Sequence, residues 1–230
     1  MSRLRFGLTF LIAWLALDRL ATAPPAPGRS LLALAIAVLV VADLRGLARP
    51  PLRTCLIALV AGALVVTGYL GGAALLGVSL HLRPDWPLVL AGVLIFHGLA
   101  EEFVWRGLAF RWLRERHSFG RAVAWSMPLI AVTHVPLLFG APWFVAVLGI
   151  VTAAVTCVPL AWLWEHGNRT IWAPAIVHAA IGMWQLWERD YPPTFSLVVV
   201  GSSIVLPLLV LLVPLSPTGS ARAARPASLR

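Results

Sequence analysis

Long apolar segments alternate along the chain with short segments that are rich in arginine, proline and glycine. A helix that crosses a membrane needs about 20 mostly apolar residues, and most of these segments come close to that length. We therefore predict about eight membrane-spanning helices, and the predicted fold class is an all-α polytopic membrane helix bundle. The predicted spans are residues 6–23, 30–44, 54–80, 86–110, 122–139, 143–164, 171–187 and 195–213.

The segments outside these spans do not predict a further domain. We find no internal repeat and no soluble domain, so residues 1–215 are predicted to form a single integral-membrane domain. Residues 216–230 consist mainly of alanine, proline, serine and arginine without apolar periodicity. Such a composition cannot bury enough apolar surface to fold, and this segment is predicted to be a disordered basic tail.

The composition agrees with a protein embedded in a lipid bilayer. Hydrophobic residues make up 60% of the chain and charged residues only 12%, whereas soluble domains contain about 25% charged residues. The net charge is +9, which raises the question of nucleic-acid binding. The arginines, however, lie between apolar segments and not in a stripe with interleaved aromatic residues, so we predict no nucleic-acid partner. They are better explained as topology signals and contacts to anionic lipids.

The distribution of arginine between alternate loops predicts the orientation of the bundle. Cytoplasmic segments of membrane proteins carry an excess of basic residues. With a cytoplasmic N-terminus, thirteen arginines fall in cytoplasmic segments and four in outer segments, so both termini are predicted to be cytoplasmic. The thirteen are Arg3, Arg5, Arg45, Arg49, Arg53, Arg111, Arg114, Arg116, Arg121, Arg169, Arg222, Arg225 and Arg230, and the four are Arg19, Arg29, Arg83 and Arg189.

Ionisable residues inside an apolar segment are the strongest functional signal in the sequence. The segment HGLAEEFVWRG, residues 97–107, places Glu101, Glu102 and Arg106 within or beside the fourth predicted span. A charged side chain at the centre of a membrane helix costs at least about 2.5 to 3.5 kcal/mol, so such residues usually face the protein interior. The alternative interpretation is that these charges lie at a cytoplasmic helix end and are solvated, because several arginines follow them.

Helical spacing assigns different roles to the two adjacent glutamates. Glu102 and Arg106 are four residues apart and share a helix face, so Glu102 is predicted to pair with Arg106 and to stay ionised. Glu101 then has no built-in partner and is free to act as an acid or base. His97 shares the face of Glu101 and could hydrogen-bond it, although the preferred interpretation is an incidental neighbour.

Two histidines in later spans extend this candidate site. His134 and His178 lie in the fifth and seventh predicted spans. A single membrane histidine is more often a packing residue, but two of them and a glutamate pair on three helices can converge on one wet cavity. Glutamate and histidine are suited to take a proton from water and deliver it to a leaving amine near neutral pH. They are also candidate zinc ligands, although no H-E-x-x-H helix is present.

Three sequence elements that contain these candidate residues form one recognisable pattern. They are Glu101-Glu102-x-x-x-Arg106, the later His134, and the stretch NRTIWAPAIVH from Asn168 to His178. As a set, over about residues 94–183, they resemble the CAAX-protease and bacteriocin-processing family of intramembrane proteases, also called CPBP or Abi. The pair formed by the first and third elements is specific, whereas either element alone is a weak signal.

The resemblance implies a membrane-embedded endopeptidase. Carried over to this sequence, Glu101 activates the hydrolytic water, His134 helps to position or activate that water, and His178 helps to stabilise the oxyanion. Glu102 and Arg106 become supporting residues. Both a glutamic and a metal-dependent mechanism have been argued for the family. The scarcity of metal ligands favours the glutamic type without a cofactor, and a zinc site is the less favoured alternative.

Two positions depart from the family pattern. Ile130 stands where the second motif usually has phenylalanine, which is a change in packing. Gly182 stands where the third motif usually has asparagine, and this change removes an amide that could donate to the oxyanion. Loss of one such donor can slow a reaction by about 100- to 1,000-fold. Gln185 returns to nearly the same helix face as His178, and our hypothesis is that its amide substitutes for the missing one.

The sequence therefore predicts an intramembrane endopeptidase that cuts a membrane-anchored protein or peptide, such as a C-terminal sorting tail, a prenylated-type tail or a leader. The lysine-free composition, rich in arginine, alanine and leucine, favours a bacterial inner membrane and a sorting or bacteriocin-type substrate. One alternative is a catalytically weak or inactive membrane scaffold or immunity protein of the same fold, for which Gly182 is the evidence. Another is a small proton-coupled transporter, but the chain lacks the repeat symmetry that is often found in transporters.

Overall fold

The structure is a computed structural model that describes residues 2–21, 31–32, 34–37, 47–140, 142–188 and 192–215. The helices in these residues form a bundle, and the described part of the chain contains no strand beyond an isolated bridge between Leu82 and Trp187. The predicted all-α class is therefore confirmed. The tail at 216–230 and most of the second predicted span, residues 30–44, lie outside the described residues.

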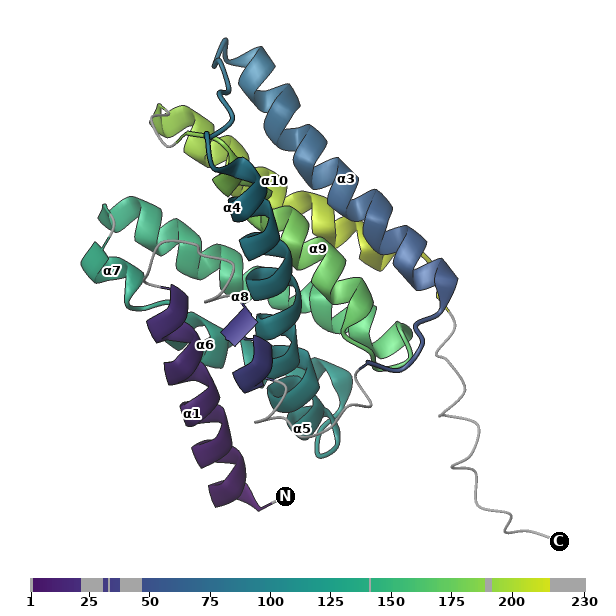
Figure 1. The fold of residues 1–230 in the computed structure, drawn as a ribbon. Helices are drawn as coiled ribbons and strands as arrows, with labels where there is room; N and C mark the ends of the chain where they lie inside the picture. The colour runs from purple at the N-terminus through teal and green to yellow at the C-terminus, as the bar shows by residue number, and fades with distance from the viewer. Residues whose placement is uncertain are drawn as a thin grey trace, which may run out of the picture.

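The helices follow one another through short connections (Figure 1). In chain order they are α1 (Arg3–Ala21), α3 (Leu52–Leu75), α4 (Trp86–Val93), η2 (Leu94–Ala100), η3 (Phe103–Phe110), α5 (Arg111–Arg114), α6 (Phe119–Thr133), α7 (Leu137–Gly140), α8 (Trp143–His166), α9 (Trp172–Gly182), η4 (Met183–Leu186), α10 (Pro193–Leu208) and η5 (Leu209–Leu212). The elements from α4 to α5 form one continuous helix, Trp86–Arg114, which we call the central helix.

Five helices in the described residues are long and apolar enough to cross a membrane. They are Leu52–Leu75, Trp86–Arg114, Phe119–Gly140, Trp143–His166 and Pro193–Leu212. The protein is thus an integral membrane protein, but the predicted count of eight spans is not confirmed. The predicted span 171–187 is shorter than expected, because α9 contains 11 residues and continues only as the 3₁₀ turn η4.

Small residues bring the helices at the middle of the bundle close together. A Cβ atom added to Gly98 on the central helix would lie 3.3 Å from both the Ala175 carbonyl oxygen and the Ala179 Cβ of α9. A Cβ atom added to Gly62 on α3 would lie 3.1 Å from the Ala180 Cβ on α9. Such small-residue contacts let helix backbones approach within a membrane. In Figure 1 the central helix runs through the middle of the bundle, with α3 on one side and α1 on the other.

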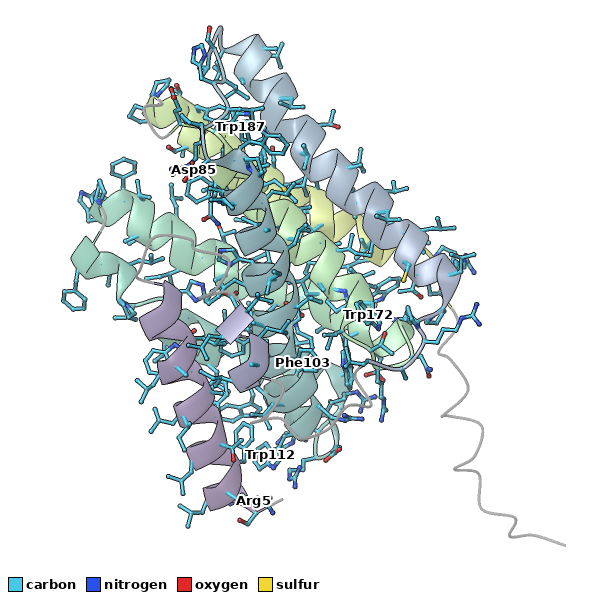
Figure 2. All side chains as sticks on the ribbon, in the orientation of Figure 1. Arg5, Asp85, Phe103, Trp112, Trp172 and Trp187 are labelled. Carbon is cyan, nitrogen blue, oxygen red and sulfur yellow. The ribbon has the colours of Figure 1, made fainter. Side chains whose placement is uncertain are left out.

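The arginine-rich helix ends gather at one end of the bundle. Arg114, at the end of the central helix, is 2.9 Å from the carboxylate of Glu165 near the end of α8. Arg53, at the start of α3, donates to the carbonyl oxygen of Pro214 after α10. Figure 2 shows Arg5 of α1 at this same end of the molecule. The described parts of the predicted cytoplasmic segments that carry Arg5, Arg53 and Arg114 therefore lie at the same end, and the orientation of that end in the membrane is a prediction.

Candidate active site

The central helix carries both adjacent glutamates at a change in its winding. Glu101 and Glu102 lie between the two π-helical segments η2 and η3. π-Helical turns are rare and occur frequently at functional sites. Two contacts between residues four apart on this helix are nevertheless formed: His97 Nδ1 lies 3.1 Å from Glu101 Oε1, and Arg106 NH1 lies 2.7 Å from Glu102 Oε1.

Glu102 and Arg106 form a buried ion pair, as predicted. Their side chains are 0% and 3% exposed. His178 on α9 joins this pair, because its Nδ1 lies 2.7 Å from Glu102 Oε1. The alternative in which these charges are solvated at a helix end is therefore wrong for Glu102 and Arg106. Removing water from an ion pair is expensive unless hydrogen bonds compensate. Glu102 Oε1 contacts both Arg106 and His178, so this carboxylate links α9 to the central helix, while its Oε2 has no hydrogen-bond partner among the described residues.

Glu101 has two partners, which corrects the prediction that it has none. Its Oε1 lies 3.1 Å from His97 Nδ1, and its Oε2 lies 3.2 Å from His178 Nε2. The sequence pattern could not place His178, because that contact depends on how closely α9 packs against the central helix. His97 is accordingly a direct partner of Glu101, and its interpretation as an incidental neighbour was also wrong.

The position of His178 between two carboxylates restricts its protons. Glu102 is paired with Arg106 and accepts hydrogen bonds only, so His178 Nδ1 must donate to it. In a neutral imidazole, Nε2 would then be a bare acceptor facing the carboxylate of Glu101. His178 Nε2 lies 3.2 Å from Glu101 Oε2, so this contact is an ion pair only when the ring carries a second proton. The arrangement places a carboxylate and an imidazole side by side in the site.

His134 reaches the same site from α6. The helix ends at Thr133, and His134 follows it at the C-cap position, where Nδ1 lies 2.9 Å from the carbonyl oxygen of Ile130. Pro136 lies two residues further on and disfavours continuation of the helix. Because a carbonyl oxygen only accepts, His134 carries a proton on Nδ1, and Nε2 of the neutral ring is left as an acceptor.

A small cavity brings the three predicted catalytic residues together. Its volume is about 30 Å³, and Glu101, His134 and His178 all line it. The rest of the lining is formed by Trp105, Arg106, Ile130, Ala153, Thr156 and Leu160. A water molecule needs about 10–15 Å³ of such space and two to four polar partners, so this cavity has room and partners for a water.

Gln185 lies in η4 and contacts His97. Its amide Nε2 is 3.0 Å from His97 Nε2, and Gln185 is not part of the cavity lining. A Cβ atom added at Gly182 would lie 3.0 Å from Val93 Cγ1 and 3.4 Å from His97 Cδ2. The space that a side chain at position 182 would enter is thus bounded by Val93 and by the His97 ring.

One cluster in the described residues could hold a metal ion. The ligand atoms of His97, Glu101 and His178 all lie within 4.8 Å of one another. Two histidines and a glutamate form one of the known ligand sets of catalytic zinc. Nδ1 of His97 and Nε2 of His178 lie 3.1 Å and 3.2 Å from the two oxygens of Glu101, so an ion bound here would take the place of these direct contacts.

Residues 83–184 match the family described as Type II CAAX prenyl endopeptidase Rce1-like, which is a family of intramembrane proteases. The match confirms the resemblance seen in the motifs. It includes Glu101, His134, His178 and Gly182, and it ends one residue before Gln185. No curated protein matches the chain with significance.

Proposed function

We propose that the chain is an endopeptidase that hydrolyses a peptide bond of a membrane-associated protein or peptide, with Glu101 as the general base. The observation that carries this proposal is the water-sized cavity lined by Glu101, His134 and His178. These side chains come from three separate elements of the bundle. A general base must lie within hydrogen-bonding reach of the water that it activates, and the cavity provides that position.

The protons follow a simple path in this mechanism. The Glu101 carboxylate takes a proton from a cavity water, and the resulting hydroxide attacks the scissile carbonyl carbon. His134 Nε2 accepts the second hydrogen of the water and orients it. In this proposal the His178 ring is protonated on both nitrogens, and its Nε2 donates a hydrogen bond to the carbonyl oxygen as negative charge develops there, while Glu101 starts as a free carboxylate. The C–N bond then breaks, and Glu101 returns its proton to the leaving amine.

The proposed mechanism is of the glutamic type and needs no metal ion. Glu101 Oε1 is hydrogen-bonded to His97, and Oε2 lies 3.2 Å from His178 Nε2, so both oxygens are oriented by neighbouring imidazoles. A carboxylate held in this way can act as a base directly. A zinc ion at His97, Glu101 and His178 is the less favoured alternative, because it would replace these contacts and remove Glu101 from the role of base.

The proposed substrate is a membrane-anchored protein or peptide of a bacterial inner membrane, such as a C-terminal sorting tail or a leader. In this proposal both chain termini lie in the cytoplasm, in keeping with the distribution of arginine. The grouping of Arg5, Arg53 and Arg114 at one end of the bundle supports this orientation.

The test is cleavage of co-expressed membrane-tail substrates in a bacterial host. Glu101→Gln keeps the size of the side chain and removes the base, so cleavage should fall by at least about 100-fold. His81→Ala is the matched control, because His81 is an exposed histidine in the loop before the central helix. Both variants are checked for thermal unfolding in detergent. Wild-type cleavage rates in a folded Glu101→Gln variant would refute the assignment of the base.

A scaffold or immunity protein that binds membrane peptides without cutting them is the second candidate, and Gly182 supports it. The family's amide at this position is missing, and Gln185 contacts His97 and is not part of the cavity lining. This alternative predicts that a tail peptide is retained by wild-type protein and by Glu101→Gln with equal affinity, and that neither protein cuts it. Cleavage by the wild type alone excludes it.

A further inference from the structure

A row of hydrogen bonds leads from Glu101 to two residues that do not line the cavity. Glu101 Oε1 lies 3.1 Å from His97 Nδ1, and His97 Nε2 lies 3.0 Å from Gln185 Nε2. Glu101 and His97 lie on the central helix, whereas Gln185 lies in η4, directly after α9. The side chains of His97 and Glu101 are 29% and 16% exposed, so this row is largely shielded from surrounding solvent or lipid.

The chemistry of the amide fixes the direction of each bond in this row. An amide nitrogen donates and does not accept, so His97 Nε2 must be the acceptor. A neutral imidazole carries a single ring proton, which must then reside on Nδ1. Nδ1 faces Glu101, so His97 donates to the carboxylate. Gln185 therefore selects the one neutral tautomer of His97 that can hold Glu101 in place.

Gly182, which stands where the family pattern has asparagine, leaves space for the contact between His97 and Gln185. An added Cβ at this position would lie 3.4 Å from His97 Cδ2 and 3.7 Å from Gln185 Nε2. An asparagine there would extend further into the space beside the His97 ring. The loss of a side chain at 182 and the contact between His97 and Gln185 are thus two parts of one local arrangement.

We propose that His97 is the positioning residue of the general base and that Gln185 acts through it by fixing its tautomer. This inference rests on the proposed function of Glu101. By holding Oε1, His97 leaves Oε2 directed at His178 and toward the cavity. The charged and titratable groups around Glu101 are His97 on its own helix, His178 on α9, His134 across the cavity and the buried pair of Glu102 and Arg106.

The first test measures the tautomer directly and does not depend on catalysis. Imidazole ¹⁵N chemical shifts are recorded for the full chain in detergent, and the His97 signal is assigned by its loss in His97→Gln. We expect the Nδ1-protonated neutral tautomer in the wild type and a mixture of tautomers in Gln185→Leu. In Gln185→Glu the new carboxylate should draw a proton onto Nε2. Nε2 protonation in the wild type, or an unchanged tautomer in Gln185→Leu, would overturn the proposal.

The second test uses the cleavage assay. Residues that orient a reactive group through hydrogen bonds typically contribute about 10- to 100-fold. We expect His97→Leu to lower kcat by this factor with KM little changed, and His97→Gln to recover part of the loss because its amide can donate to Glu101. Gln185→Leu should lower kcat less, and the double variant should be no worse than His97→Leu alone, because the two residues act in series.

The outcomes separate this inference from the proposed function. If Glu101→Gln abolishes cleavage while His97→Leu and Gln185→Leu cut at the wild-type rate, the positioning role is refuted and the protease stands. If the reductions in kcat multiply in the double variant, and if kcat falls in parallel with the melting temperature, then His97 and Gln185 have only a structural role. If Glu101→Gln cuts like the wild type, the proposed function fails, and the NMR experiment still decides whether Gln185 fixes the His97 tautomer.

Discussion

His178 Nδ1 lies 2.7 Å from Glu102 Oε1, which joins α9 to the most deeply buried charge described on the central helix. The other nitrogen of the same ring lies 3.2 Å from Glu101 Oε2. One imidazole therefore contacts two adjacent carboxylates that differ in environment. Glu102 is fixed by Arg106 and fully buried, whereas Glu101 borders the cavity. Glu102 thus holds the orientation of the His178 ring, and Glu101 contacts the same ring at the cavity.

Arg106→Leu should destabilise the folded protein strongly. It leaves the Glu102 carboxylate buried without its cation, and breaking a buried pair in this way costs about 3–5 kcal/mol. The double variant Glu102→Gln with Arg106→Leu should recover part of this loss, because it removes the buried charge. Thermal unfolding of purified protein in detergent measures both effects.

The control for this prediction is the exposed pair between Arg83 and Asp85, in the loop before the central helix. Hydrogen bonds from Arg83 hold the pKa of the Asp85 carboxyl below its ordinary value, but both side chains are substantially exposed. Asp85→Asn should leave the melting temperature unchanged, since exposed pairs contribute little. Equal melting temperatures for Arg106→Leu and the wild type would show that the buried pair is not structural.

Gly71 and Gly72 form a matched pair for testing the contact between α3 and α10. A Cβ atom added at Gly72 would clash with Val198 on α10, whereas one added at Gly71 would meet nothing within 4 Å. We expect Gly72→Ala to destabilise by about 1–3 kcal/mol through overpacking. Gly71→Ala should be neutral or stabilising by up to about 1 kcal/mol, because alanine favours the helix. The same unfolding assay gives both values, and equal effects at the two positions would contradict the packing of these helices.

His134→Ala should reduce kcat by about 100-fold or more if His134 orients the attacking water, in keeping with the usual contribution of acid–base groups. His134→Gln should retain more activity, because its amide can also contact a water in the cavity. His81→Ala serves as the control in the same assay. Unfolding is measured in parallel, because His134 also donates to the Ile130 carbonyl oxygen at the end of α6. Full activity in a folded His134→Ala variant would remove it from the site.

Chelation separates the glutamic from the metal-dependent mechanism. If Glu101 is the base, then dialysis against EDTA or 1,10-phenanthroline should leave the cleavage rate of purified enzyme unchanged, and added Zn²⁺ should not raise it. Added Zn²⁺ should instead inhibit, because binding at His97, Glu101 and His178 would occupy the base. Loss of activity on chelation, with recovery on addition of Zn²⁺, would establish the metal-dependent alternative.

Local spacing in the sequence was sufficient to predict part of this site. The pair formed by Glu102 and Arg106 follows from a separation of four residues on one helix, and the structure contains it. The convergence of Glu101, His134 and His178 was predicted from the rule that ionisable side chains in apolar helices face the interior. The cavity that they line agrees with that rule, while their catalytic roles remain predictions.

The features that were missed depend on packing between helices. Nothing in the periodicity of the central helix shows how far α9 lies from it, so the contact from Glu101 to His178 could not be predicted. The role of His97 was missed because its second partner, Gln185, lies 88 residues later in the chain. The length of α9 was overestimated because the apolar segment continues through residues that form a 3₁₀ turn.

Gly98 carries no reactive group, but α9 packs so closely against it that few substitutions should be tolerated there. A methyl group there would lie within 3.3 Å of α9, so the two helices would have to separate by a few tenths of an ångström. Glu101 and His178 lie on opposite sides of that contact, and their 3.2 Å separation would lengthen with it. The absence of a side chain at Gly98 thus allows the short distance between Glu101 and His178, so a position without any reactive group limits the geometry of the site.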